Sequence, residues 1–161
     1  MNNTERYIDR LYKKINVNSH EQLSVNHIAL FLNIDVVYWK HTSAIANYHN
    51  RHTIFINETL GLRRQWQDFG HEMAHFCWHD GSQKHLFQTY LDYQEIKADY
   101  FALHFCVPTF MLMELKGVTA YDIMTLFNVE FDFAIRRLEI HKNKMIKTWG
   151  GNGNALQTSK K

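Results

Sequence analysis

A chain of 161 residues is the size of one domain with a single modest hydrophobic core. Apolar residues make up 45% of it and charged residues 21%, and these values exclude wholesale disorder, collagen-like repeats and fibrous architecture. The formal net charge of +2 is too small to indicate nucleic-acid binding by itself. The sequence therefore predicts one folded domain, which we place at residues 1–149.

The sequence shows neither a signal peptide nor a membrane span. Residues 1–14 carry charges among their apolar positions, so they lack the apolar segment of a signal peptide. No apolar run approaches the roughly eighteen residues that a membrane span needs. Cys77 and Cys106 stand in apolar surroundings and form no CxxC pair, as is typical of reduced core residues. We expect a cytoplasmic protein without a membrane partner.

The first third of the chain predicts two helices and a small sheet. Apolar residues recur at helical spacing over residues 8–15 and again over residues 25–32, where Ser24 is a suitable N-cap. Three short β-branched or aromatic stretches follow, separated by polar residues, at residues 34–39, 44–48 and 53–56. We interpret them as an antiparallel sheet of three strands.

The remaining sequence predicts helices. Helical spacing returns after Asn57 and ends near Asp80 and Gly81, with Gly81 suited to the C′ position. A further helix over residues 93–107 is stopped by the only proline, Pro108. Residues 118–147 predict two helices joined near Asn128, with the outline of a helix-turn-helix, and residues 150–161 predict a flexible tail. Late in the second of these two helices, Lys142, Lys144 and Lys147 are typical of a solvated helix face. The expected fold class is α+β and mostly helical.

The chemistry-bearing motif is HEMAH at residues 71–75, an HExxH pattern inside the first of these later helices. Residues four positions apart lie on one helix face, so His71 and His75 can converge on a single ion. Glu72, one step round the helix, can reach a water molecule at that ion. This pattern predicts a catalytic metal site with Glu72 as the general base.

A catalytic zinc site usually needs a third protein ligand. His79 is one candidate, but on a straight helix His71, His75 and His79 spread over about 12 Å, too far for one ion, so a structural helix-end role is favoured. Glu95 on the next helix is the better candidate, and Asp99 four positions later can accept a hydrogen bond from a ligand histidine. Taken alone, these two carboxylates would be read as solvated surface charges. We expect Zn²⁺, with Mn²⁺ or another divalent ion as alternatives.

With these motifs the sequence resembles the ImmA/IrrE family of metallo-endopeptidases, whose pattern is HExxH followed by ExxA[DN]xFA. The second element stands here as EIKADYFA at residues 95–102, and the IFIN segment at residues 54–57 resembles the strand that precedes the metal helix in the family. Met73 and Ala74 replace the Leu-Gly that is common within HExxH, which should affect packing rather than chemistry. The resemblance implies a zincin-like metallopeptidase fold. For short members in mobile elements it also implies cleavage of a helix-turn-helix repressor, which releases silenced genes.

The mechanistic hypothesis is that Glu72 takes a proton from the attacking water and passes it towards the leaving amine. A donor must also stabilise the oxygen that gains negative charge. The sequence leaves five candidates for that donor open: Tyr48, His49, His52, Tyr100 and Tyr121. The strand at residues 53–56, if it forms the sheet edge above the metal, could pair with an extended substrate.

Two other functions compete with this one. The helix-turn-helix outline at residues 118–141 would suit a DNA-binding regulator, but Glu130 and Asp132 stand in the first turn of the would-be recognition helix, where phosphate repels carboxylates. Direct nucleic-acid binding is therefore not favoured. The metal site could also serve a non-proteolytic antirepressor or antitoxin that works by binding alone. A structural zinc more often has four thiolate or imidazole ligands, so catalysis is favoured.

Overall fold

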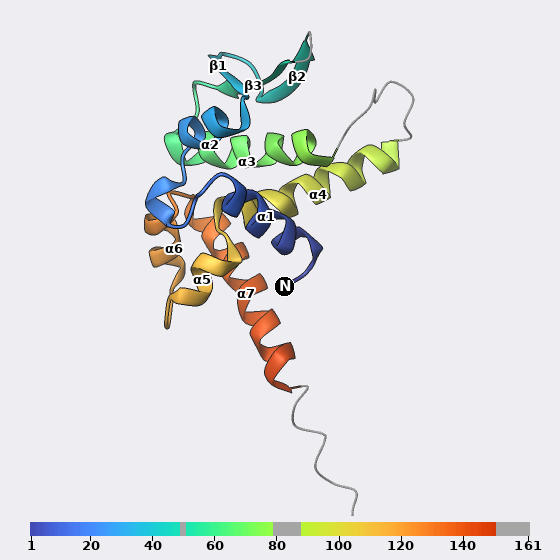
Figure 1. Cartoon of the computed structure of the whole chain (residues 1–161). Helices are drawn as coiled ribbons and strands as arrows, with labels where there is room; N and C mark the ends of the chain where they lie inside the picture. Colours follow the sequence, from blue (N-terminus) through green and yellow to red (C-terminus); the bar gives the residue numbers. More distant parts are fainter. Residues whose placement is uncertain (49–50, 79–87, 151–161) are drawn as a thin grey trace, which may run out of the picture.

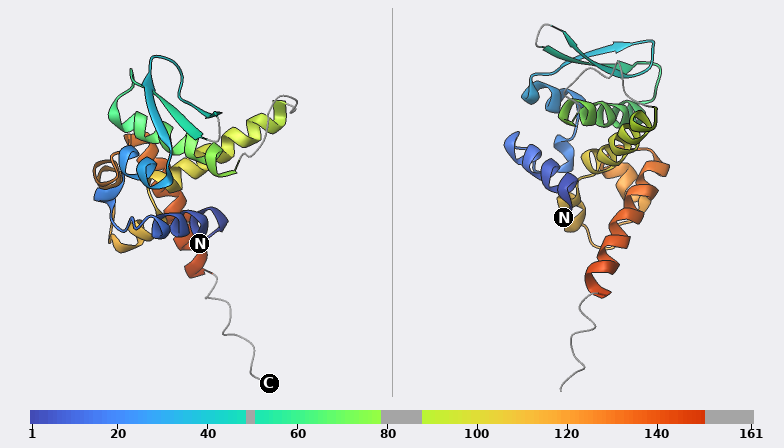
Figure 2. Two further views of the ribbon diagram at one scale, coloured as in Figure 1. Left: turned by 45° about the horizontal axis from the view of Figure 1, so that its top comes forward. Right: turned by 90° about the vertical axis from the view of Figure 1, so that its right-hand side faces the viewer.

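The computed structural model describes residues 1–48, 51–78 and 88–150. A small sheet lies along one side of the helix α3 (Leu62–Trp78), and most of the other helices gather on the opposite side (Figure 1). The long helix α4 (Gln88–Cys106) packs along α3 and makes its main helical contact with it. Two further views show the same order of layers (Figure 2). The fold is α+β and mostly helical, as expected.

The opening helices begin where their caps are. In α1 (Asn3–Lys14) the side chain of Asn2 accepts a hydrogen bond from the backbone N–H of Glu5, and the Glu5 carboxylate accepts one from the N–H of Asn2. This capping box satisfies two backbone donors at the helix start. A short 3-10 turn η1 (His20–Gln22) leads to α2 (Val25–Leu32), where Ser24 caps the N–H of His27 as predicted.

The sheet is mixed, so the prediction of an antiparallel sheet is wrong. Its strands are β1 (Asp35–Trp39), β2 (Ala44–Tyr48) and β3 (Arg51–Asn57). Their order is β1-β3-β2, with β1 parallel to β3 and β2 antiparallel to it. The physical reason is burial: β3 carries the fully buried Ile54 and Ile56, and it takes the central place with hydrogen bonds on both sides. The strand that follows β1 in the chain therefore pairs on the far side of β3.

The later helices match the predicted pattern with two differences. The helix α4 begins at Gln88, earlier than residue 93, and Pro108 precedes an additional short helix, α5 (Thr109–Glu114), which was not predicted. The chain then forms α6 (Ala120–Leu126) and α7 (Phe131–Gly150), and Asn128 between them has a left-handed backbone with φ 50°. The predicted helix end at residues 80–81 lies outside the described part of the chain, as does the predicted tail at residues 150–161 except for Gly150, which ends α7. Within the described ranges, no helix combines the length and the apolar character that crossing a membrane requires.

The core between α3 and α4 depends on one close approach. At Gly70 an added Cβ would lie 2.7 Å from Sγ of Cys106 and 3.3 Å from the ring of Phe105. Cys106 is a fully buried free thiol that donates to the backbone oxygen of Trp66. The absence of a side chain at Gly70 therefore lets the two helices that carry the HExxH and ExxAD motifs pack close together.

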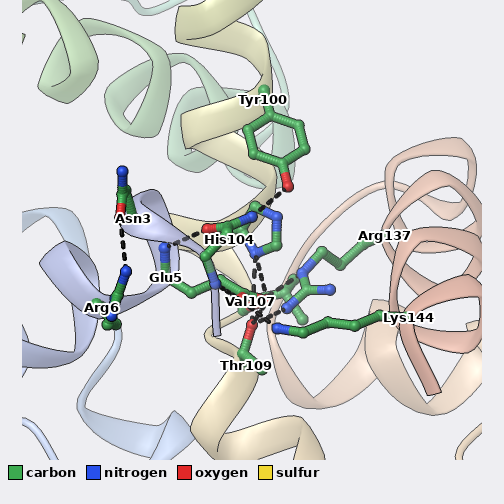
Figure 3. Close-up of polar contacts among 10 residues, drawn as sticks. Asn3, Glu5, Arg6, Tyr100, His104, Val107, Thr109, Arg137 and Lys144 are labelled. Carbon is green, nitrogen blue, oxygen red and sulfur yellow. Dashed lines mark hydrogen bonds and ion pairs between the residues drawn. The ribbon is translucent and has the colours of Figure 1, made fainter. Parts of the chain in front are cut away.

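A buried polar cluster ties the chain start to the C-terminal helices (Figure 3). The Glu5 carboxylate accepts hydrogen bonds from Thr109 Oγ1 at 2.8 Å and from Lys144. Arg137 is fully buried and donates to Thr109 Oγ1 at 2.8 Å and to the backbone oxygen of Val107 at 2.9 Å. Lys144 thus pairs with a buried carboxylate, whereas the sequence placed it on a solvated face. The cluster fixes α7 against α1 and against the start of α5.

Candidate metal centre

The two histidines of the HExxH motif converge as their spacing predicts. His71 and His75 lie one turn apart on α3, and their Nε2 atoms are 3.2 Å from each other. Both side chains are largely buried, with 23% and 12% of their surfaces exposed. Two imidazole nitrogens therefore lie close enough together, beside α3, to bind the same ion.

Glu95 on α4 brings a carboxylate to the same point. One of its oxygens lies 3.0 Å from Nε2 of His71, and the other lies 3.5 Å from Nε2 of His75. The ligand atoms of the three residues all lie within 4.8 Å of one another. Glu95 thus faces the two histidines and does not stand alone in solvent.

Asp99, one turn further along α4, contacts the other side of His71. Its Oδ1 atom is 3.0 Å from Nδ1 of His71. Because an ionised carboxylate can only accept, the proton of this hydrogen bond belongs to Nδ1. The neutral imidazole then presents the lone pair of Nε2 towards His75 and Glu95, as a metal ligand requires.

The donor set fits a divalent cation of the zinc type. Zinc is bound by imidazole nitrogen and carboxylate oxygen at about 2.0–2.2 Å, which in tetrahedral coordination separates neighbouring ligand atoms by about 3.3 Å. The observed separations are 3.0, 3.2 and 3.5 Å. Three protein ligands would leave the fourth position open, which is typical of catalytic rather than structural zinc.

Glu72 lies next to these groups but is buried, with 8% of its surface exposed. Burial raises the pKa of its carboxyl to about 7, the neighbouring His71 acts in the opposite direction, and Glu95 and Asp68 add to the rise. The nearby backbone of Ile45 in β2 acts in the lowering direction as well. Glu72 is therefore a carboxyl group held between the metal helix and the sheet.

All of these residues line one cleft of about 950 Å³ between the sheet, α3, α4 and α7. Several polar residues that no motif in the sequence indicates also line this cleft, among them Ser43 and Asp68. The Ser43 hydroxyl donates to Asp68 at 2.6 Å and accepts from the backbone N–H of Asn57 at 3.1 Å. These bonds hold the turn before β2 to α3, one helical turn before Glu72. The one signal in the sequence is that Asp68 stands four positions before Glu72, which places both carboxylates on one helix face.

The structure separates the five candidates for the stabilising donor. His52 lines the cleft, and its ring packs edge-on against Phe76 with the ring centres 4.8 Å apart. Tyr100 lines a different groove and accepts a hydrogen bond from Asn2, and Tyr121 packs against Phe131 and does not line the cleft. His49 and the side chain of Tyr48 lie outside the described residues.

The sheet edge above the centre is β2, not the strand at residues 53–56. The register of β3 pairs it with β1 on one side and β2 on the other, so β3 is central and cannot accept a further strand. Residues 44–47 of β2 line the cleft instead. An extended chain would therefore meet β2.

The comparisons with known proteins agree with these motifs. The model of the IrrE N-terminal-like domain family, Peptidase_M78, matches residues 32–139. The uncharacterized protein YqaB of Bacillus subtilis (strain 168) is 32% identical over 146 residues, which cover 88% of this chain and 85% of YqaB. The phage-like element PBSX protein XkdA of the same strain is 30% identical over 149 residues, which cover 89% of this chain and 75% of XkdA. The chain therefore belongs to the Peptidase_M78 family of IrrE N-terminal-like domains.

Proposed function

We propose that this protein is a zinc-dependent endopeptidase that cleaves a helix-turn-helix repressor of a prophage or mobile element. The observation that carries the proposal is the convergence of His71, His75 and Glu95 within 4.8 Å, in the cleft that Glu72 also lines. Membership of a peptidase family supports the reaction. The similarity to XkdA, named for a phage-like element, supports the genetic setting.

The ligands are assigned as His71, His75 and Glu95, with Asp99 orienting His71 through the 3.0 Å contact at Nδ1. A divalent cation bound there supplies Lewis-acid polarisation of the scissile carbonyl and lowers the pKa of water. Glu72 takes the proton of the attacking water and delivers it to the leaving amine. Glu72 follows His71 on α3 and lines the same cleft, which gives its carboxylate access to the attacking water and to the leaving amine.

His52 is the proposed donor to the oxygen that gains negative charge. It is the one candidate among the five whose side chain is described and lines the cleft. The backbone groups on the outer edge of β2 are proposed to pair with the substrate in extended form, as added strands do. Because a folded helix cannot pair in this way, cleavage would require a locally unfolded segment of the repressor.

The geometry does not favour DNA binding through residues 118–141. Glu130 at the start of α7 donates its backbone N–H to Gln67 of α3 at 2.6 Å, so the first turn of the helix is held against the cleft. Arg137 is fully buried, and Arg136 lines the cleft. Of the two adjacent arginines of this helix, one is thus inaccessible to DNA and the other lies at the cleft beside the proposed metal ligands.

The experiment is incubation of the purified protein with the repressor encoded nearest its gene, with and without a chelator. We expect one discrete cut, which is lost with the chelator and in Glu72→Gln. That variant should keep the metal content of the wild type, since Glu72 is not a ligand. A matched control is Glu114→Gln, an exposed carboxylate outside the cleft that should leave the cut unchanged. A repressor that is bound but left intact would support the non-proteolytic antirepressor instead, and a full cut by Glu72→Gln would refute the assigned base.

A further inference from the structure

The cleft carries opposite charges at different places along its walls. Four carboxylates line it, on α3 and α4, at Asp68, Glu72, Glu95 and Asp99. Two cations also line it, Arg64 on α3 and Arg136 on α7. A substrate chain that lies along the cleft therefore meets a cationic group as well as the catalytic carboxylates.

The two arginines differ in their partners. Arg64 donates to Asp68 at 2.9 Å and lies 4.0 Å from Glu130, so its charge is already compensated. Arg136 is exposed, and no carboxylate of the described residues lies within 4.0 Å of its guanidinium. The protein thus presents one cleft-lining cation without an ion-pair partner in the described part of the chain.

The helix that carries Arg136 is fixed on both sides of it. At its start, the backbone N–H of Glu130 donates to Gln67, which is itself buried on α3. The adjacent residue, Arg137, is fully buried and donates to Val107 and Thr109 (Figure 3). Because its neighbour is fixed by these contacts, the backbone of Arg136 is held at the cleft wall, and only its side chain has to be ordered on binding.

From this placement we infer that Arg136 is a specificity-determining residue that binds a carboxylate of the substrate chain. The inference rests on the proposed peptidase function for its biological meaning. The planar guanidinium can donate two parallel hydrogen bonds to a carboxylate, which a lysine cannot match. Phe133, one turn earlier on α7, also lines the cleft and provides an apolar contact for the stem of the same substrate residue. The preferred substrate segment therefore carries an Asp or Glu, or ends in a carboxylate, within the part that lies in the cleft.

The test is retention of peptides from a degenerate library by immobilised Glu72→Gln protein, with and without added Zn²⁺. The library has acetylated N-termini and amidated C-termini, so that carboxylates occur only in Asp and Glu side chains. A second library with free C-termini tests the terminal carboxylate. We compare the Glu72→Gln background with the same background carrying Arg136→Glu, Arg136→Lys or Lys142→Glu. Lys142 is exposed on the same helix and does not line the cleft, so its reversal is the matched control.

We expect Arg136→Glu to retain acidic peptides about fivefold less than the background and to gain preference for Lys and Arg at the same position. Arg136→Lys should keep part of the acidic preference, and Lys142→Glu all of it. The preference should weaken in 0.5 M salt, because an exposed ion pair is screened. The inference would be overturned if the peptides retained by Arg136→Glu and by Lys142→Glu had the same content of Asp and Glu. It would also be overturned if the Glu72→Gln background retained no acidic peptides.

Cleavage of the same libraries by the wild type separates this inference from the proposed function. If the wild type cuts nothing while the acidic preference in binding is lost in Arg136→Glu, the peptidase proposal fails and the role of Arg136 stands. If it cuts peptides without regard to acidic residues, the peptidase proposal stands and the role of Arg136 is refuted.

Discussion

Asp99 holds His71 by a contact of 3.0 Å at Nδ1, on the side of the ring opposite to the nitrogen that faces His75 and Glu95. The carboxylate is on α4 and the imidazole on α3, so this one hydrogen bond joins the two helices at the centre. It sets the tautomer of His71, a proposed metal ligand, as well as the direction of its ring.

Replacement of Asp99 by Asn should therefore lower metal affinity by about 10- to 100-fold without removing a ligand. An amide can present its NH₂ group to Nδ1, which favours the tautomer with the proton on Nε2, where it blocks coordination. Competition with a chromophoric zinc chelator measures the effect. The matched control is Asp92→Asn on the same helix, whose carboxylate accepts from Gln88 at 2.9 Å. Equal zinc affinities for the two variants would contradict the orienting role.

Gly70→Ala should destabilise the fold by about 1–3 kcal/mol, because the new Cβ overpacks a filled core. It would lie 2.7 Å from the buried Cys106 thiol, and the better helix propensity of Ala offsets only about 1 kcal/mol of the cost. Since the clash pushes α3 from α4, zinc affinity should fall as well. Urea unfolding and chelator competition measure the two effects.

Gly61→Ala is the control for this substitution, since nothing lies within 4 Å of its added Cβ. Combining Gly70→Ala with Cys106→Ala should cost less than the sum of the two single changes, because the second removes the clashing atom. If the losses in unfolding free energy from the two single changes simply added, the Cβ at residue 70 would not be in contact with Cys106.

The parts of the site that the sequence predicts are those with local spacing. His71 and His75 lie four positions apart on one helix, as do Glu95 and Asp99 on the next, and helical geometry alone places each pair on one face. The N-cap at Ser24 is local in the same sense, since its partner is three residues away. The period of the helix is enough to predict such features, because each of them joins residues only three or four positions apart.

The parts that escaped prediction depend on long-range packing. The alternation of apolar residues in a strand does not depend on whether the neighbouring strand is parallel or antiparallel. The central place of β3 and the edge position of β2 could therefore not be predicted from that pattern. Arg136 and Arg137 are adjacent in the sequence, yet one lines the cleft and the other is fully buried. Lys144 pairs with Glu5, which is 139 positions away. No local pattern contains these contacts.

His52→Phe should lower kcat for repressor cleavage by about 10²-fold or more, as loss of a donor to the developing negative charge does. Phe keeps the edge-on packing against Phe76 but removes the N–H groups, so the melting temperature and zinc content should not change. His52→Gln, which keeps an N–H donor, should retain more activity. Wild-type kcat in His52→Phe would exclude His52 from the reaction and leave only the undescribed side chains of Tyr48 and His49 among the five candidates that could face the cleft.

Acidification should destabilise the protein through the buried polar cluster, to which His104 of α4 also belongs, because its Nδ1 lies 3.4 Å from Thr109 Oγ1 and 3.8 Å from a carboxylate oxygen of Glu5. Burial is the largest cause that lowers the pKa of His104, Arg137 and Lys144 act in the same direction and Glu5 opposes them, and the resulting pKa is about 3. Burial alone would raise the pKa of Glu5, but hydrogen bonds from Lys144, Asn2 and Thr109 outweigh it and lower the pKa to about 2. Both folded-state values lie below those of the unfolded chain, about 6.5 for His and 4.3 for Glu.

Both groups therefore make the protein less stable as pH falls, but they do so in different pH ranges. The unfolded chain binds a proton at His104 first, so its contribution is complete above about pH 6.5 and falls as pH drops towards 3, by at most about 1.4 kcal/mol per pH unit. The contribution of Glu5 is lost only below about pH 4.3, as pH falls towards 2. In the same range Glu72, whose pKa is raised to about 7, takes up a proton first in the folded state and acts in the opposite direction in the wild type and in the variant alike. The stability advantage of the wild type over His104→Asn, measured by urea unfolding, should therefore shrink from pH 7.5 to 4.5. His41→Asn, at an exposed histidine, should keep the wild-type slope. Parallel curves for His104→Asn and the wild type would mean that His104 takes up its proton in the folded state as readily as in the unfolded chain, and that the cluster does not hold it neutral.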